Sequence, residues 1–174
     1  DMSAIAQGYA VDKIGEFLNR RGVKDYLVEI GGEVTTRGKN PNGKFWRIGI
    51  DKPVDSTVMG QRQLQAVVKL KNQSIATSGN YRQFYVEDGV KYSHTINPKT
   101  GYPVKHKLLS VSVFADKCVF ADALATAFMV MGKEKSKQII EENDDLGAYF
   151  IFSDKQGNFQ VACTENVKDL IENL

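Results

Sequence analysis

Short strand-like segments joined by tight turns, with helical segments placed irregularly between them, limit the possible folds of this chain. Asp88-Gly89 separates two such segments and is a strong hairpin signal. A doubly wound or barrel fold would need strand and helix patterns to alternate regularly, and they do not. We therefore expect an α+β fold, with helices packed on a largely antiparallel sheet. Strands are expected at residues 26–30, 33–36, 45–51, 64–71, 74–78, 82–87, 91–94, 109–115, 148–152 and 159–163.

Helical periodicity is confined to four segments. They are residues 3–20, 118–131, 135–143 and 165–174. Asp1 or Ser3 can serve as the N-cap of the first helix, and Gly22 stands where a helix-ending glycine belongs. Residues 97–107 contain prolines and a glycine that exclude regular structure, so an ordered loop is expected there.

The 174 residues suit one domain, residues 1–174, and the start at Asp1 with an immediate helical pattern suggests a mature or trimmed fragment. A net charge of +2 and the lack of a basic stripe studded with aromatics argue against nucleic acid as a partner. No apolar run approaches the about 20 residues of a membrane span. Cys118 and Cys163 are either buried free thiols or one disulfide.

Asp122 and Thr126 form the first candidate site. Residues four apart lie on the same face of a helix, so this carboxylate and hydroxyl present two hard oxygen ligands side by side. Mg²⁺ prefers such donors and completes its shell with water and phosphates. The alternative is an alanine-rich packed helix in which Asp122 is the N-cap and Thr126 bonds back to a backbone carbonyl.

His94 is the second candidate, because it ends a strand just before a rigid loop, where a histidine can act as a general base. A histidine satisfied by the backbone is the alternative, and His106, between two lysines, is expected to be solvated. The turn of residues 78–82, which includes Arg82, and the Gly31-Gly32 pair are either anion cradles or simple turns. Neither has the spacing of a dinucleotide-binding or P-loop motif.

Five segments, in order, closely resemble motifs of the ApbE family, the FAD:protein FMN transferases. They are residues 1–12 (DMSAIAQGYAVD), 31–33 (GGE), 78–82 (SGNYR), 92–103 (YSHTINPKTGYP) and 121–127 (ADALATA). The resemblance runs through most of the chain, and the long histidine-containing motif is its most specific part. It departs from the family pattern at Asn97, where Asp is commoner, and at Gln7, where Lys is frequent.

The resemblance implies a role for seven residues. Asp122, Thr126 and the backbone carbonyl of Ala4 would bind Mg²⁺. Asp1, Gln7 and Ile96 would contact FAD. His94 would be the base that activates the acceptor hydroxyl. The loss of charge at Asn97 makes a metal-binding role for that residue doubtful.

The function that the resemblance implies is Mg²⁺-dependent transfer of FMN from FAD, through a phosphoester bond, to a threonine of an acceptor flavoprotein. The same residues would serve a Mg²⁺-dependent FAD pyrophosphatase that yields FMN and AMP, and a flavin-binding module without catalysis is the third reading. The resemblance also implies a bacterial periplasmic or cell-envelope location, with a lipid anchor in some relatives. The resemblance also implies that residues 1–174 are the C-terminal portion of a longer protein. A chain lacking the N-terminal stretch would expose apolar surface and could self-associate.

Overall fold

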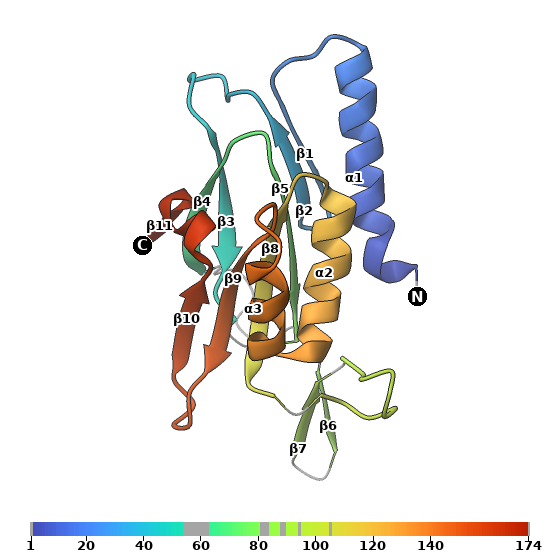
Figure 1. Ribbon diagram of the computed structural model, residues 1–174, viewed down its shortest axis with the longest axis vertical. Helices are drawn as coiled ribbons and strands as arrows, with labels where there is room; N and C mark the ends of the chain where they lie inside the picture. The colour runs from blue at the N-terminus through green and yellow to red at the C-terminus, as the bar shows by residue number, and fades with distance from the viewer. Residues whose placement is uncertain are drawn as a thin grey trace.

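The structure is a computed structural model that describes residues 2–53, 63–80, 84–87, 90–93, 95–104 and 106–173, with only the backbone of 84–87, 90–93 and 173 described. Its described strands form three sheets, and every strand pair is antiparallel. This confirms the predicted α+β class. The helices lie on one face of the largest sheet (Figure 1).

The largest sheet has six strands in the order β1-β2-β5-β8-β9-β10. Their bounds are β1 Tyr26–Ile30, β2 Glu33–Arg37, β5 Ser74–Gly79, β8 Leu108–Ala115, β9 Gly147–Ser153 and β10 Phe159–Cys163. Strand β8 is central and almost wholly buried, because helices cover one of its faces and a second sheet covers the other. Val111 and Val113 therefore pack toward the helices, and Phe114 packs toward the second sheet.

The second sheet has the order β11-β4-β3, with β3 Trp46–Asp51, β4 Leu64–Leu70 and β11 Ile171–Asn173. Val68 and Leu70 of β4 are fully buried against Ile75 and Ile151 of the large sheet. A separate hairpin joins β6 Phe84–Glu87 to β7 Val90–Ser93.

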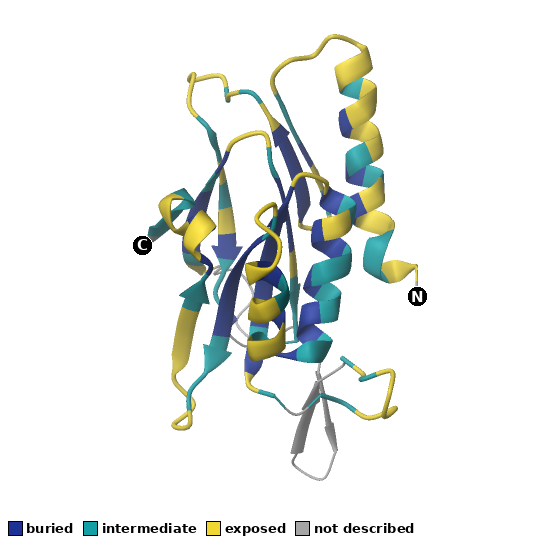
Figure 2. Cartoon of the chain, in the orientation of Figure 1, coloured by how far each residue is buried: buried dark blue, intermediate teal, exposed yellow. Residues whose placement is uncertain are grey.

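Three helices cover the other face of the large sheet: α1 Ser3–Arg20, α2 Cys118–Met131 and α3 Lys133–Glu141. In Figure 2 the outward sides of α1 and α3 are largely exposed, whereas α2 is mostly buried or intermediate. Helix α1 packs on α2 through Val11 and Cys118, both fully buried. No described helix is long and apolar enough to cross a membrane.

Two local predictions were wrong. Residues 165–174 were expected to be one helix, but a 3-10 turn covers Glu165–Leu170 and β11 follows it. Ile171 pairs with Val68, so burial in the second sheet overrides the local helical pattern. Met2, without a side-chain cap bond, stands at the N-cap of α1 instead of Asp1 or Ser3. The predicted helix end near Gly22 is confirmed, because α1 ends at Arg20 and Gly22 has a φ of 78°.

Candidate functional site

A pocket of about 540 Å³ lies where the start of α1, the β1–β2 turn, the ends of β3 and β5, and α2 come together. Its described lining residues are Ser3, Gln7, Glu29, Gly31, Gly32, Glu33, Gly49, Ile50, Asp51, Thr77, Ser78, Gly79, Thr95, Asp122, Thr126 and Met129. Within this described lining, every ionisable side chain is a carboxylic acid, and no lysine, arginine or histidine contributes. The pocket is therefore acidic.

Asp122 lies on the buried side of α2 and is 5% exposed. Its Oδ2 accepts a hydrogen bond from the backbone amide of Gly8 at 2.9 Å. Burial raises the pKa of the Asp122 carboxyl, and the Gly8 amide partly offsets that rise. Asp122 therefore sits in a second turn of the helix as a buried acceptor rather than as the N-cap of α2.

The missing side chain of Gly8 makes this contact possible. A Cβ atom at Gly8 would lie 2.6 Å from the Cys118 carbonyl oxygen and 2.8 Å from the Asp122 Cβ. Helices α1 and α2 can approach this closely only with glycine at that position. The same approach places Ala4, one turn earlier on α1, beside the pocket lining formed by Ser3 and Gln7.

Thr126 follows one turn after Asp122 and lines the same pocket, as the four-residue spacing predicted. Its Oγ1 lies 3.3 Å from the Ser78 Oγ on β5, so a hydroxyl pair closes this side of the pocket. The neighbouring Thr77 hydroxyl bonds to Ser112 at 2.7 Å across the β5–β8 pair. The sequence of residues 78–82 permits either an anion cradle or a simple turn. Ser78 and Gly79 end β5 and line the pocket, whereas Arg82 lies outside the described residues.

The residues predicted to contact FAD lie in different places. Gln7 lines the pocket, but Ile96 is 45% exposed, pairs with Pro103 and is absent from the described lining. The neighbouring Thr95 does reach the pocket. Asp1 and His94 lie outside the described residues, so their predicted roles stay predictions.

The structure gives the side chains of Asn97 and His106 specific hydrogen-bond partners. The Asn97 side-chain oxygen accepts the Lys99 amide at 2.9 Å within its own loop. His106 is half-buried rather than solvated. Its Nδ1 accepts the Leu108 amide, so its Nε2 donates to the Met129 carbonyl at 2.7 Å and caps the end of α2.

Asp12 is a structural residue that the sequence reading missed. Its two carboxylate oxygens accept the amides of Cys118 and Val119 at 2.9 and 3.0 Å, and so satisfy the start of α2 from a different helix. The available signal was a carboxylate on the face of α1 that also carries Gly8 and Val11, because a charge on a buried face needs a partner.

Glu33 is the second residue that was missed as a site residue. It begins β2, directly after the Gly31-Gly32 turn, and is only 7% exposed. Its Oε2 is buried without a hydrogen-bond partner among the described residues. Burial raises the pKa of the Glu33 carboxyl, the residue's own backbone amide partly offsets that rise, and the charge of nearby Asp122 adds to it. The sequence signal was the carboxylate after a glycine pair, but its burial depends on α1 and α2.

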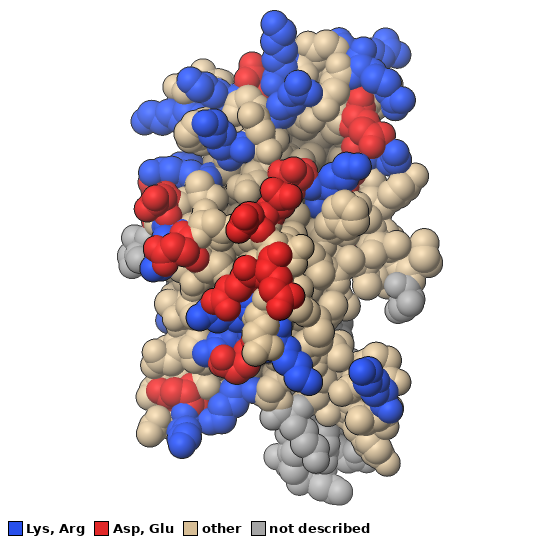
Figure 3. All heavy atoms as spheres, viewed as in Figure 1, with Lys and Arg blue, Asp and Glu red and all other residues tan. Residues whose placement is uncertain are grey.

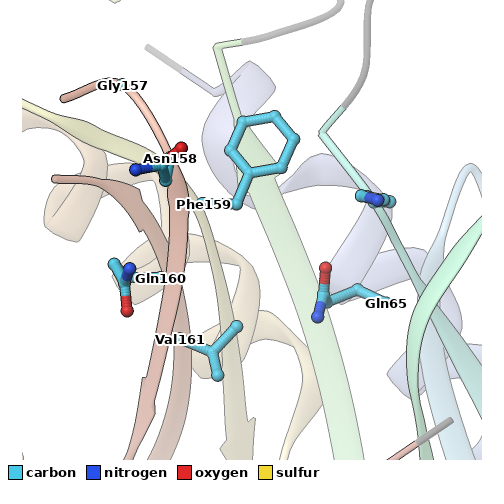
Figure 4. A pocket seen from close by; sticks show the side chains of 7 residues that line it. Gln65, Gly157, Asn158, Phe159, Gln160 and Val161 are labelled. Carbon is cyan, nitrogen blue, oxygen red and sulfur yellow. The ribbon is translucent and has the colours of Figure 1, made fainter.

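A second pocket, of about 590 Å³, opens beside the edge strand β10 and is lined by Lys52, Gln65, Gly157, Asn158, Phe159, Gln160 and Val161. In Figure 4 Phe159 and Val161 point toward Gln65, and Gln160 lies on the other side of its strand. This pocket contains none of the predicted site residues. Its described lining offers one charged group, Lys52, and no carboxylate, so it has no counterpart to the acidic chemistry of the first pocket.

The cysteines and the surface charge do not add to the site. Cys118 and Cys163 are both free, and burial raises the pKa of the Cys118 thiol. Acidic side chains gather across the middle of the face in Figure 3, where the end of α3 and the next turn carry an exposed acidic run. That run consists of Glu141, Glu142, Asp144 and Asp145, and it lines neither pocket.

The oxygen donors of the acidic pocket fit a hard divalent cation. Asp122, Thr126 and backbone carbonyls are ligands that Mg²⁺ accepts, and Mg²⁺ usually keeps waters or substrate phosphates in its remaining positions. Among the described residues, no group of three or more His, Cys, Asp and Glu side chains is arranged around one metal position. The fit is therefore to a site that shares its ion with a ligand, not to a cage of protein carboxylates.

Comparisons with known proteins identify relatives of this chain. The model of the ApbE family matches residues 1–150. The FAD:protein FMN transferase of Haemophilus influenzae is 42% identical over 157 residues, which are 90% of this chain and 44% of the relative. The flavin transferase ApbE of Vibrio cholerae superposes with a TM-score of 0.83 at 39% identity, covering 98% of this chain and 52% of that one. The apo flavinyl transferase ApbE of Pseudomonas stutzeri gives a TM-score of 0.81 with 50% of its chain covered.

This chain thus spans about half the length of the relatives it matches. Its similarity extends over the helix that carries Gln7, the glycine turn and the helix that carries Asp122 and Thr126, all of which lie within the matched residues. The chain therefore belongs to the ApbE family.

Proposed function

We propose that this protein is a Mg²⁺-dependent flavin transferase, which takes FMN from FAD and joins it through a phosphoester bond to a threonine of an acceptor protein. The observation that supports this most is the buried acidic pocket beside Asp122 and Thr126. A pocket whose described ionisable groups are all carboxylic acids repels a pyrophosphate, and a divalent cation that binds with it offsets this repulsion. Relatives that carry the name FAD:protein FMN transferase support the choice of FAD.

The chain's own groups would fix the ion from two helices. Asp122 is held in place by the Gly8 amide, and Thr126 by the Ser78 hydroxyl. In a regular α-helix the Ala4 carbonyl pairs with the amide of Gly8, and that amide here donates to Asp122. The Ala4 oxygen is thus suited to a further partner. When bound, Mg²⁺ would neutralise phosphate charge and make AMP a better leaving group.

In the proposed reaction the threonine oxygen bonds to the phosphorus of the FMN half as the bond from that phosphorus to the AMP oxygen breaks. AMP leaves, and the threonine proton passes to a base. The assignment of that base to His94 rests on the sequence alone. Gln7 would bind the substrate near the start of α1, where it lines the pocket. The cell-envelope location stays an expectation from the family resemblance.

The test uses the natural protein that contains these 174 residues, incubated with FAD, Mg²⁺ and a candidate acceptor. Mass spectrometry of the acceptor is expected to show a covalent FMN adduct. Asp122→Asn should reduce the rate of adduct formation by about 100-fold or more, the scale of losing one preorganised electrostatic contact. Calorimetric titration with Mg²⁺ alone should show weaker binding by the same variant.

Asp144→Asn is the matched control, because Asp144 undergoes the same chemical change on the exposed surface away from both pockets. It should leave the adduct and Mg²⁺ binding unchanged. Steady release of AMP without any acceptor, and no adduct when acceptors are supplied, would assign the pocket to FAD hydrolysis instead. Full Mg²⁺ binding by Asp122→Asn would remove Asp122 from the metal site.

A further inference from the structure

Glu33 has a carboxylate that the proposed metal site does not use. It lines the pocket, it is 7% exposed, and its Oε2 has no hydrogen-bond partner among the described residues. Leaving a buried acceptor unpaired destabilises a folded protein, so such a group commonly has a partner that arrives with a ligand. Glu29, on the neighbouring strand, also lines the pocket but is exposed to solvent.

A second polar group, the side-chain amide of Gln7, lies near the Glu33 carboxylate at the β1–β2 turn. A Cβ atom added at Gly31 would overlap the Gln7 side-chain nitrogen and would lie 3.3 Å from the Glu33 Oε2. The amide of Gln7 and the carboxylate of Glu33 therefore face the same small space, which exists because residue 31 is a glycine with φ of 69°. This space combines one hydrogen-bond donor with one unpaired acceptor.

The chemistry of these two groups selects what can bind between them. A carboxylate accepts hydrogen bonds and repels phosphate, whereas the nitrogen of Gln7 donates. A hydroxyl satisfies both groups at once, because it donates through its hydrogen and accepts at its oxygen. Glu33 lies close enough to Asp122 for their charges to interact. The hydroxyls of FAD nearest to its pyrophosphate belong to the ribityl chain on one side and to the ribose on the other.

We propose that Glu33 binds a sugar hydroxyl of the dinucleotide next to the pyrophosphate, with Gln7 contacting the same hydroxyl from α1. This rests on the proposed function, because it takes FAD as the ligand. Glu33 then sets the position of the sugar relative to the metal-binding oxygens of Asp122 and Thr126. It is a binding residue for the substrate, and it does not ligate the metal.

The experiment measures calorimetric binding of FAD, FMN and ADP, each with saturating Mg²⁺, to the natural protein that contains these residues. Glu33→Gln is expected to weaken FAD binding by about 10-fold, because a hydrogen bond to a charged acceptor is replaced by one to a neutral acceptor. It should also weaken either FMN, which has only the ribityl hydroxyls, or ADP, which has only the ribose hydroxyls. The affected ligand identifies the sugar.

Glu142→Gln is the control, since it makes the same chemical change on the exposed surface outside both pockets; its FAD affinity should change by no more than about twofold. Glu33→Asp, which keeps the charge but shortens the side chain, should weaken FAD binding as Glu33→Gln does and covers the case in which the glutamine variant does not fold.

Three results would overturn the assignment. One is unchanged FAD affinity in Glu33→Gln. Another is a loss of affinity for Mg²⁺ alone as large as that of Asp122→Asn, because Glu33 would then be a metal ligand. The third is a wild-type protein that binds Mg²⁺ but no FAD, which overturns the proposed function and this inference with it. The first two results leave the proposed function intact.

Discussion

At the scale of single residues, the pocket contains two buried carboxyl groups that differ in their partners. Asp122 has the Gly8 amide, whereas the Oε2 of Glu33 has no partner among the described residues. The four-residue spacing of Asp122 and Thr126 was enough to predict that they share a face, and both line the pocket. The burial of Glu33 was not predictable, because it is produced by helices distant in sequence rather than by the turn that precedes it.

The raised pKa of Glu33 predicts how stability depends on pH. Its pKa in the folded state lies above its unfolded value, so its contribution to stability is fully present below the unfolded pKa and is lost as pH rises through the folded pKa. Glutamine does not ionise, so the stability of the Glu33→Gln variant should not fall as the pH rises through the folded pKa of Glu33. Without metal at neutral pH, we expect it to raise the melting temperature by about 2–4 °C, for a change of about 1 kcal/mol.

The gain from Glu33→Gln should disappear in acid, near the unfolded pKa of about 4.3. Glu16→Gln is the comparison, because Glu16 is exposed and its hydrogen bond to Lys13 lowers its pKa. That variant should change stability little, and any change should be a loss. Thermal unfolding across pH tests both variants, and a Glu33→Gln protein that melts lower than wild type at neutral pH would contradict the prediction.

At the scale of elements, the contact between α1 and α2 shapes the site. Both helices were predictable from their periodicity, and the predicted bounds of α2 are those observed. Their contact was not predictable, because it depends on Gly8 and Asp12, whose partners are more than 100 residues away. The C-terminal strand was missed for a similar reason: Ile171 is fixed by pairing with β4 rather than by its own neighbours.

Gly8→Ala tests the close approach of the two helices. Alanine normally stabilises a helix interior by about 1 kcal/mol over glycine. Here its Cβ would lie 2.6 Å from a backbone oxygen, so we expect a net loss of about 1–3 kcal/mol and weaker Mg²⁺ binding. Gly15→Ala, where the nearest atom is a tyrosine oxygen at 3.2 Å, should lose less stability and keep Mg²⁺ affinity. Denaturant unfolding measures the stability of both variants, and calorimetry measures their Mg²⁺ affinity. Equal losses in the two variants would show that Gly8 is not specifically required for the close approach of α1 and α2.

Asp12→Ala should leave the amides of Cys118 and Val119 without their acceptor and destabilise the fold by about 1–2 kcal/mol. Because α2 carries Asp122 and Thr126, Mg²⁺ affinity should also fall. Asp154→Ala is the comparison: it removes a carboxylate that accepts the amides of Gln156 and Asn158 in a distant turn. That variant should lose stability without losing Mg²⁺ affinity. If both variants bind Mg²⁺ as wild type does, the start of α2 does not control the metal site.

At the scale of the whole molecule, the two faces of the large sheet are covered differently. The second sheet seals one face with buried aliphatic side chains. The helices cover the other, and the outer side of α1 remains exposed in Figure 2. The α+β class could be predicted from the irregular order of strands and helices. The division into a six-stranded and a three-stranded sheet could not, because it depends on pairings such as β2 with β5, which no turn signal specifies.

The outer side of α1 predicts that the 174-residue chain self-associates. Met2, Tyr9 and Phe17, at 73%, 55% and 50% exposure, recur at intervals of seven and eight residues and so share a face. Light scattering over a range of concentrations should show a rising average mass. The double variant Tyr9→Ser and Phe17→Ser should lower it, whereas Tyr102→Ser, at an equally exposed loop position, should not. A constant monomer mass in the wild type would refute this.

The hydrogen bond between Gly8 and Asp122 joins residues 114 positions apart in the sequence. On a ribosome, the first helix therefore emerges long before its carboxylate partner has been synthesised. Contacts of such long range slow folding, because the loop between them must close before they stabilise anything. The acidic pocket is thus among the last parts of the molecule that can form, and a nascent chain that stops short of α2 lacks both side chains proposed to bind Mg²⁺.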